Sequence, residues 1–455
     1  MDTPAPAQPL LKKEYISVLL TVALPVMFHN VISLGLNLID LLMIGRLGVN
    51  ELAAVGAASR VYSIFVMMCF GLICGFSVYT SQYWGVRDIK NIRRVYGLAA
   101  TSMISLALLF VLLAAFFGRP ILYLFVKDPA VVELSRQYLI ISVFSFPFLA
   151  YSFCTSFSSR SLRRLVAVTS INALALAIKT WLNYLFLFGN FGMPRLGLTG
   201  AAWGTVIARV LEMIMMVIYI YGSREHPLAG KLRELFSFDM TLARKIFKTV
   251  LPVLGNESAH MLGMTLFYVI ISYLGTEAVA VMQVSMLVND FFLAIFFGLG
   301  GAVAVITGNE LGRGHKELAY TNGVLALKVT VFLSLLIGAL LFIARGPIVQ
   351  LYSLGPVASG ILSQVLTVCA LYIPIRMLVY VLIIGLLRAG GDTRFCMFVQ
   401  ACTILFVGVP LAFTGALILQ LPLYAVLALL LTCDLASLMI CYPRFRSKVW
   451  INKLI

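Results

Sequence analysis

Long apolar runs, separated by short polar stretches, follow one another along almost the whole chain. Each run can form a helix of about 20 residues, the length that crosses a hydrocarbon layer of ~30 Å. The pattern predicts an all-α integral membrane protein with twelve transmembrane helices. Their predicted cores are residues 16–45, 52–82, 95–117, 131–156, 165–189, 198–222, 246–273, 279–309, 320–344, 360–386, 395–418 and 421–443.

The second half of this pattern repeats the first. A shift of 227 residues (252 minus 25) aligns the two halves without a gap from the first span into the fourth. The aligned pairs include Pro25 with Pro252, Gly48 with Gly275, Gly71 with Gly298, Gly85 with Gly312, and Pro147 with Pro374. Each half holds an even number of spans, so the halves share one orientation and are related by an axis along the membrane normal. We therefore expect two pseudo-symmetric six-helix bundles.

The repeat and the loops predict how the chain is divided. The predicted parts are a cytoplasmic tail (1–15), an N-terminal six-helix lobe (16–222), a cytoplasmic linker (223–245), a C-terminal six-helix lobe (246–443) and a basic cytoplasmic tail (444–455). The linker is the longest polar stretch between spans, which makes it the natural boundary between the lobes.

Composition excludes a water-soluble fold, because 61% of the residues are hydrophobic, 11% are charged and the mean hydropathy is +1.01. The net charge of +16 is spread over loops rather than gathered in one basic domain, so we expect no nucleic-acid partner. Most Lys and Arg residues fall on the side shared by both ends of the chain. The positive-inside rule then places both termini in the cytoplasm. We expect the chain to span the inner or plasma membrane in contact with lipid. We also expect it to be a monomer.

Ionisable side chains inside spans mark candidate functional sites, because their burial is costly unless they are paired or hydrated. Asp40 lies near the outer end of the first span and Asn183 near the outer end of the fifth. Lys179 lies one turn from Asn183 on the same helix face. We predict that Asp40 couples ion movement within a polar pocket shared with Asn37, Lys179 and Asn183. The alternative is a structural hydrogen bond near the helix end.

The second lobe carries a further set of charges, Glu257, Asp290 and Arg376. Glu257 aligns with Asn30 and Asp290 with Ser63, so the shared scaffold does not require acids at these positions. Burial favours a protonated carboxyl group and a nearby cation favours the ionised form. We predict that Glu257, with Asp290, exchanges an ion and that Arg376 is the charge partner of Glu257.

Other polar and sulfur-containing residues have simpler interpretations. Arg209 and Glu212 are three residues apart on one helix and are predicted to form a structural pair. All eight cysteines lie within or at the edge of apolar spans without metal-like spacing. No Gly-x-x-x-x-Gly-Lys-Ser/Thr loop is present, and no catalytic constellation is clustered in the spans. We therefore expect no enzyme activity, resident metal or cofactor.

Several spaced motifs together resemble the multidrug and toxic compound extrusion (MATE) family over nearly the whole chain. They are Asn37-Leu38-Ile39-Asp40, Ile44-Gly45-Arg46-Leu47-Gly48, Gln82-Tyr83-Trp84-Gly85, Gly200-Ala201-Ala202-Trp203-Gly204-Thr205, Gly275-Thr276-Glu277-Ala278 and Leu387-Arg388-Ala389-Gly390-Gly391-Asp392-Thr393. The resemblance implies an antiporter for organic-cation or drug-like substrates, driven by sodium or protons. It also implies that the carboxylates matching Asp40 and Glu257 take part in coupling.

The sequence departs from the family in two places. An Asn-x-x-x-Asp element of the fifth span reads Lys179-Thr180-Trp181-Leu182-Asn183, and an acid found in the tenth span of some members is missing near Arg376. Fewer acids and more cations make a poorer sodium site. We predict a secondary antiporter that exports drug-like or organic-cation compounds in exchange for H⁺ or Na⁺ by rocker-switch alternating access. The alternative is a flippase for a lipid-linked saccharide or another amphiphilic precursor.

Overall fold

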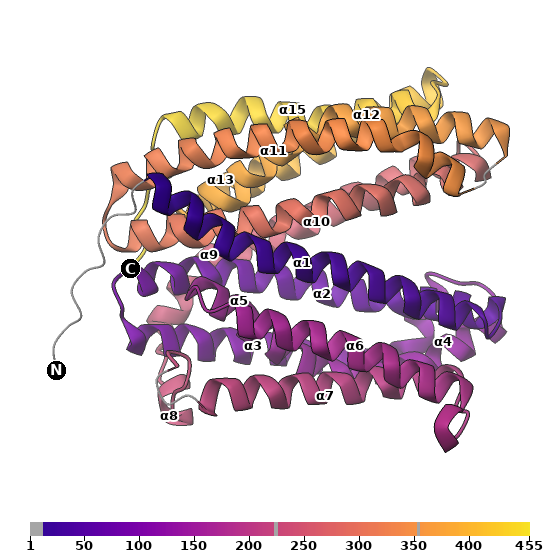
Figure 1. The fold of residues 1–455 in the computed structure, drawn as a ribbon, viewed down its shortest axis with the longest axis horizontal. Helices are drawn as coiled ribbons and strands as arrows, with labels where there is room; N and C mark the ends of the chain where they lie inside the picture. The colour runs from indigo at the N-terminus through magenta and orange to yellow at the C-terminus, as the bar shows by residue number, and fades with distance from the viewer. Residues whose placement is uncertain (1–11, 223–225, 353–354) are drawn as a thin grey trace. The chain divides into compact units, whose positions relative to one another are not determined.

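The computed structural model describes residues 12–222, 226–352 and 355–455, and every regular element in these ranges is helical (Figure 1). The prediction of an all-α fold is confirmed. Residues 1–11 of the predicted N-terminal tail and residues 223–225 of the predicted linker lie outside the described residues.

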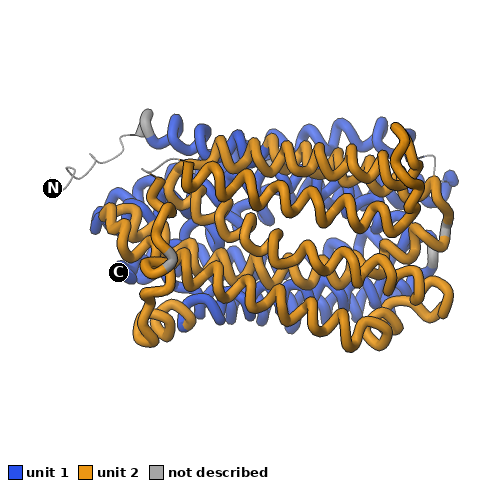
Figure 2. Tube along the Cα trace, turned by 90° about the horizontal axis from the view of Figure 1, so that it is seen from below, with its two compact units in different colours: residues 1–27, 248–455 blue, residues 28–247 orange. Residues whose placement is uncertain are grey.

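The chain forms two compact units, coloured separately in Figure 2. Unit 2 comprises residues 28–247, and unit 1 comprises residues 1–27 together with 248–455. Helix α1 (Lys12–Gly45) contributes to both units, and so does α9 (Met240–Ser272). The other elements of unit 2 are α2 (Val49–Gly85), α3 (Ile89–Tyr123), α4 (Pro129–Ser142), η1 (Val143–Ser145), α5 (Phe146–Ser161), α6 (Val166–Phe188), η2 (Asn190–Gly192), α7 (Leu198–Gly222) and α8 (Leu232–Leu235).

Unit 1 is built mainly from the second half of the chain. Beside its parts of α1 and α9 it contains α10 (Thr276–Gly312), α11 (Lys316–Leu351), α12 (Pro356–Tyr380), η3 (Val381–Leu387), α13 (Thr393–Cys402), η4 (Thr403–Gly408), α14 (Val409–Phe413), η5 (Thr414–Ile418) and α15 (Leu423–Arg446). Within this unit, the first residues of α1 and the last residues of the chain lie at the same end of the helices (Figure 1).

The limits of the units differ from the predicted lobes, 16–222 and 246–443, because two helices cross between the units. In unit 1, α1 runs close to α10: a Cβ on Gly298 would lie 2.8 Å from the Ala23 carbonyl oxygen. In unit 2, the start of α9 is held by α2. The Tyr79 hydroxyl donates a hydrogen bond to the Lys245 carbonyl oxygen at 3.2 Å, and the rings of Phe76 and Phe247 meet edge to face.

Eleven helical segments of the described chain are long and apolar enough to cross a membrane. They coincide with eleven of the twelve predicted spans. Three predicted spans are built from more than one element: the fourth predicted span comprises α4 to α5, the tenth comprises α12 and η3, and the eleventh comprises α13 to η5. The remaining predicted span is α9, which is 33 residues long but carries Asn256, Glu257 and His260 near its middle. These polar residues lower the hydropathy of a helix that is otherwise long enough to span.

Exposed apolar side chains recur along the long helices. On α11, Phe332, Leu336, Leu340 and Ile343 recur at helical spacing and are all exposed. A stripe of this kind is costly in water and favourable against lipid tails. The protein is therefore a multi-pass membrane protein, while the cytoplasmic location of both termini stays a prediction.

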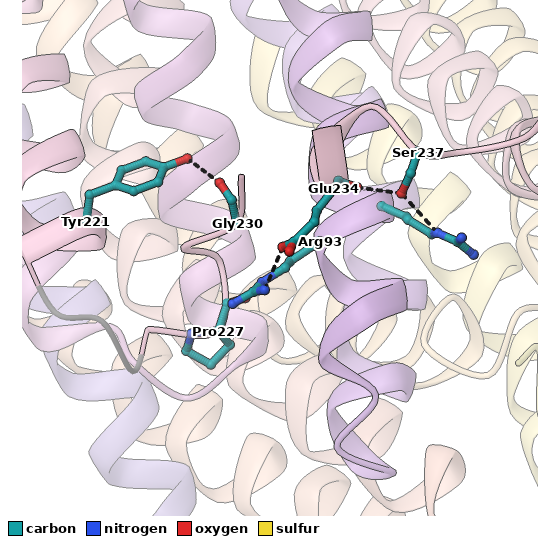
Figure 3. A network of polar contacts seen from close by, with 7 residues as sticks. Arg93, Tyr221, Pro227, Gly230, Glu234 and Ser237 are labelled. Carbon is teal, nitrogen blue, oxygen red and sulfur yellow. Dashed lines mark hydrogen bonds and ion pairs between the residues drawn. The ribbon is translucent and has the colours of Figure 1, made fainter. Parts of the chain in front are cut away.

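Part of the predicted linker is folded against unit 2 (Figure 3). Arg93 on α3 donates hydrogen bonds to the Pro227 carbonyl oxygen at 3.2 Å and to Glu234 at 2.7 Å. The Tyr221 hydroxyl donates to the Gly230 carbonyl oxygen at 3.1 Å. The described part of the linker, from residue 226 on, is thus anchored to α3 and α7.

Acid is expected to loosen this anchored segment through His226, which is buried beside Tyr219. Burial, and secondly the nearby Arg164 guanidinium, lower the pKa of His226 from 6.5 to about 4. Between these two values the imidazole gains a proton more readily when the segment is undocked, so docking weakens as the pH falls. Hydrogen exchange of residues 226–235 should rise between pH 6.5 and pH 4. The rise should flatten in His226→Gln, and an equal rise in that variant would contradict the assignment.

Candidate functional site

Asp40 forms the centre of a polar cluster in unit 2. Its side chain is buried, with 6% of its surface exposed. The Lys179 ammonium lies 2.9 Å from Asp40 Oδ2, and Asn183 Nδ2 donates a hydrogen bond to Asp40 Oδ1 at 3.2 Å. The structure thus brings together three of the four residues of the predicted pocket, and each oxygen of the carboxylate has a partner of its own.

Asn37 does not belong to this cluster. It lies one turn before Asp40 on α1, but its side chain is exposed and no hydrogen bond to the cluster is found among the described residues. Residues three apart are neighbours on a helix, yet only one of the two needs to face the adjacent helix. The structure therefore does not bring Asn37 together with the other three residues, and its place in the pocket stays a prediction.

The close packing of α6 and α7 positions Asn183. A Cβ on Gly204 would lie 2.6 Å from Asn183 Oδ1, and one on Gly200 would lie 2.8 Å from the Phe186 carbonyl oxygen. The two glycines, one turn apart on α7, therefore let α6 approach closely. This gives a physical reason for the glycines of the Gly200 to Thr205 motif.

Gly204→Ala is expected to destabilise unit 2 by about 1–3 kcal/mol, because the added methyl group must displace the Asn183 side chain from Asp40. Thermal unfolding of the purified protein in detergent measures the effect. The matched control is Gly222→Ala on the same helix, where an added Cβ meets nothing within 4 Å. Equal stability of the two variants would contradict the proposed contact.

A neighbouring tyrosine completes the surroundings of Asp40. The Tyr138 hydroxyl is hydrogen-bonded to Thr205 and interacts electrostatically with Asp40. Tyr138 packs against a buried apolar cluster that includes Ile44, Val55 and Leu187, at the ends of α1, α2 and α6. No pattern in the sequence singled out Tyr138, because one Tyr among many in the spans carries no spacing signal.

Unit 1 contains a second buried carboxylate with a cationic partner. Glu257 on α9 is 7% exposed, and its Oε1 lies 2.7 Å from Arg388 Nη2. The predicted partner was Arg376, and this pairing was wrong. Depth along a straight helix gives the level of a residue in the membrane but not the direction of its side chain. Arg388, directly after η3, reaches Glu257 instead.

Neighbouring contacts fix Glu257 on its helix. Asn256 Nδ2 donates a hydrogen bond to Gln400 Oε1 at 2.8 Å, and a Cβ on Gly255 would lie 3.0 Å from the Met397 sulfur. Helix α9 is thus held against α13 directly beside the Glu257–Arg388 pair. In the sequence, Arg388 stands out only as part of the motif from Leu387 to Thr393, and nothing in that motif indicates the direction of its side chain.

Arg376 lies in a looser group of charges within unit 1. It interacts electrostatically with Asp290 on α10, with Asp434 on α15 and with His260 on α9. No ion pair within 4 Å joins Arg376 to an acid in the described part of the chain, and Asp290 is exposed. Asp290 is therefore not part of the Glu257–Arg388 pair. It interacts electrostatically with Arg376 in the same unit.

Arg209 and Glu212 form the predicted pair on α7, at 2.6 Å. Arg209 also donates a hydrogen bond to the Tyr62 hydroxyl at 3.4 Å. Both side chains are largely buried, and the pair satisfies itself within one turn. The predicted contact is confirmed.

Family comparison agrees with the two-fold construction. The MatE family model matches residues 25–185 and 252–414. The matches begin 227 residues apart (252 minus 25), which is the shift of the internal repeat. Together they cover more than half of the chain. The fold is that of a membrane transporter, and the chain belongs to the MATE family.

Relatives named as multidrug resistance proteins match most of the chain. The probable multidrug resistance protein NorM of Pasteurella multocida is 25% identical over 410 residues, covering 88% of this chain and 86% of that protein. The multidrug resistance protein MdtK of Pectobacterium atrosepticum is 25% identical over 409 residues, covering 87% and 86%. An uncharacterized transporter of Bacillus subtilis, YisQ, is 24% identical over 418 residues, covering 91% and 90%.

Solved structures share the fold at low sequence identity. A mutant of the MATE transporter VcmN of Vibrio cholerae matches with a TM-score of 0.86 at 17% identity, over 96% of this chain and 99% of that chain. A transporter of the MOP superfamily from Pyrococcus furiosus matches with a TM-score of 0.84 at 18% identity, over 98% of each chain. These likenesses confirm the architecture of a MATE transporter.

Proposed function

We propose that this transporter exports drug-like or organic-cation compounds across the cell membrane in exchange for protons. The observation that carries the proposal is the position of the Lys179 ammonium, 2.9 Å from Asp40. The ammonium occupies the place beside the carboxylate that a coupling metal cation such as sodium would need. The names of the NorM and MdtK relatives support drug-like compounds as cargo and do not favour the lipid-linked saccharide alternative.

The contacts of Asp40 argue against sodium as its coupling ion. Hard cations prefer several oxygen ligands. One Asp40 oxygen is occupied by an ammonium and the other by an amide donor, neither of which contributes a ligand. A sodium ion would also approach a fixed positive charge, and this repulsion is large where water is excluded. In unit 1, Arg388 has the same effect at Glu257.

A proton can replace these interactions without needing a cage of ligands. When Asp40 takes a proton, it loses its charge and Lys179 loses its ion-pair partner. A half-buried ammonium without a partner is costly, so α1 and α6 are driven to rearrange until Lys179 is hydrated or Asp40 releases the proton. We propose that this cycle in unit 2, and protonation of Glu257 in unit 1, accompany the alternating exposure of substrate to the two sides.

Purified protein in proteoliposomes tests the choice of ion. A fluorescent organic cation such as ethidium is loaded, and either a proton gradient or a sodium gradient at equal pH is imposed. We expect transport against the ethidium gradient with the proton gradient and none with sodium alone. Transport driven by sodium at clamped pH would overturn the proposal.

A further inference from the structure

The residues after α15, which belong to the predicted basic tail (444–455), are packed against the helices of unit 1. Trp450 has 0% of its surface exposed, and its indole Nε1 donates a hydrogen bond to the Phe445 carbonyl oxygen at 3.0 Å. Its ring stacks on Phe445, which in turn stacks on Tyr320 of α11. Residues 447–455 are thus folded back onto unit 1, with a large aromatic side chain as their anchor.

This segment lies directly on the loop between η3 and α13. The Asn452 amide donates a hydrogen bond to the Gly390 carbonyl oxygen at 3.2 Å. A Cβ on Gly390 would overlap the Trp450 carbonyl oxygen, and one on Gly391 would lie 2.9 Å from the Leu454 side chain. Gly391 also has a φ of +86°, which favours glycine. The two glycines are therefore the surface on which the segment rests.

The same loop carries Arg388, two residues before Gly390. The far end of the loop is fixed by Asp392, whose Oδ2 lies 2.8 Å from Arg444 Nε at the end of α15. The loop is therefore held from one side by Arg444 and covered by residues 450–454. Arg388 extends from it to Glu257 at 2.7 Å.

We propose that Trp450 is a positioning residue for coupling: by holding the Arg388 loop in place, it keeps the Arg388 guanidinium on the Glu257 carboxylate. This inference rests on the proposed function, in which Glu257 exchanges a proton. Other charged or titratable groups in the electrostatic surroundings of Glu257 are His260 on its own helix and Arg376 on α12. The segment acts on Glu257 through Arg388.

The pH dependence of proton-driven ethidium efflux distinguishes positioning from simple packing. When Arg388 is no longer held, Glu257 loses the cation beside its carboxylate, and a nearby cation favours the ionised form of a carboxyl group. In Trp450→Ala we expect the efflux profile to move to higher pH by about one unit. Trp450→Phe retains the aromatic anchor and should restore the wild-type profile, while Lys453→Ala, on an exposed residue of the same segment, should leave it unchanged.

A second pair of variants covers the case in which Trp450→Ala does not fold. Asn452→Pro removes the amide that donates to Gly390, whereas Asn452→Ala keeps it. We expect the pH profile to move only in the proline variant. A wild-type profile in both Trp450→Ala and Asn452→Pro would overturn the positioning role. A normal rate and profile in Glu257→Gln would instead overturn the proposed function of Glu257, so the two failures are distinguishable.

Discussion

Asp40→Asn is expected to abolish transport against a gradient, lowering the rate by at least about 100-fold, which corresponds to about 2.7 kcal/mol. Asparagine keeps the size of the side chain and can still bond Asn183, but it cannot exchange a proton. The variant also leaves the Lys179 ammonium without its anionic partner, which should lower the free energy of unfolding by about 2–4 kcal/mol. Proteoliposome efflux and thermal unfolding measure the two effects separately.

The double variant Asp40→Asn/Lys179→Met separates coupling from folding. It removes both charges of the Asp40–Lys179 pair, so no unpaired charge remains. Most of the stability lost in Asp40→Asn should therefore return. Transport should not return, since the proton carrier is still missing. Recovery of transport along with stability would show that the pair is structural.

Breaking the Glu257–Arg388 pair is expected to have the second largest effect. Glu257→Gln and Arg388→Ala should each reduce proton-driven efflux at least tenfold, or about 1.4 kcal/mol. Each should also lower the free energy of unfolding by about 3 kcal/mol, since each leaves a buried group without its partner. The double variant should be destabilised by clearly less than the sum of the two single effects.

Arg376→Ala supplies the control for this cycle. Arg376 has no ion pair to Glu257 among the described residues, so its effect on stability should add to that of Glu257→Gln. If Glu257 were coupled to Arg376 and not to Arg388, the assignment of the pair would be wrong.

The sequence predicted the fold well because transmembrane helices follow directly from length and hydropathy. The repeat was equally readable, since Gly and Pro recur at fixed spacing in both halves. What it did not show is that α1 and α9 cross between the units. Alignment of Pro25 with Pro252 shows that the two helices are equivalent, but not which neighbours each half of a helix contacts.

The site in unit 2 was predictable because its residues lie in regular helices. Lys179 and Asn183 share a helix face, and Asp40 lies at a similar level, so helical geometry alone brings them close. The partner of Glu257 was not predictable, because Arg388 lies in a loop whose path depends on packing. Trp450 was missed for a related reason: a single aromatic residue in a basic segment has no periodicity from which burial is inferred.

Release of protons on substrate binding tests the central claim most directly. Purified protein in weakly buffered detergent solution, with a pH-sensitive dye, is mixed with ethidium at a series of starting pH values. We predict proton release from the wild type, reduced release from Asp40→Asn and from Glu257→Gln, and none from the double variant. Unchanged release from the double variant would contradict the account, because the protons would then come from groups other than the two buried carboxylates.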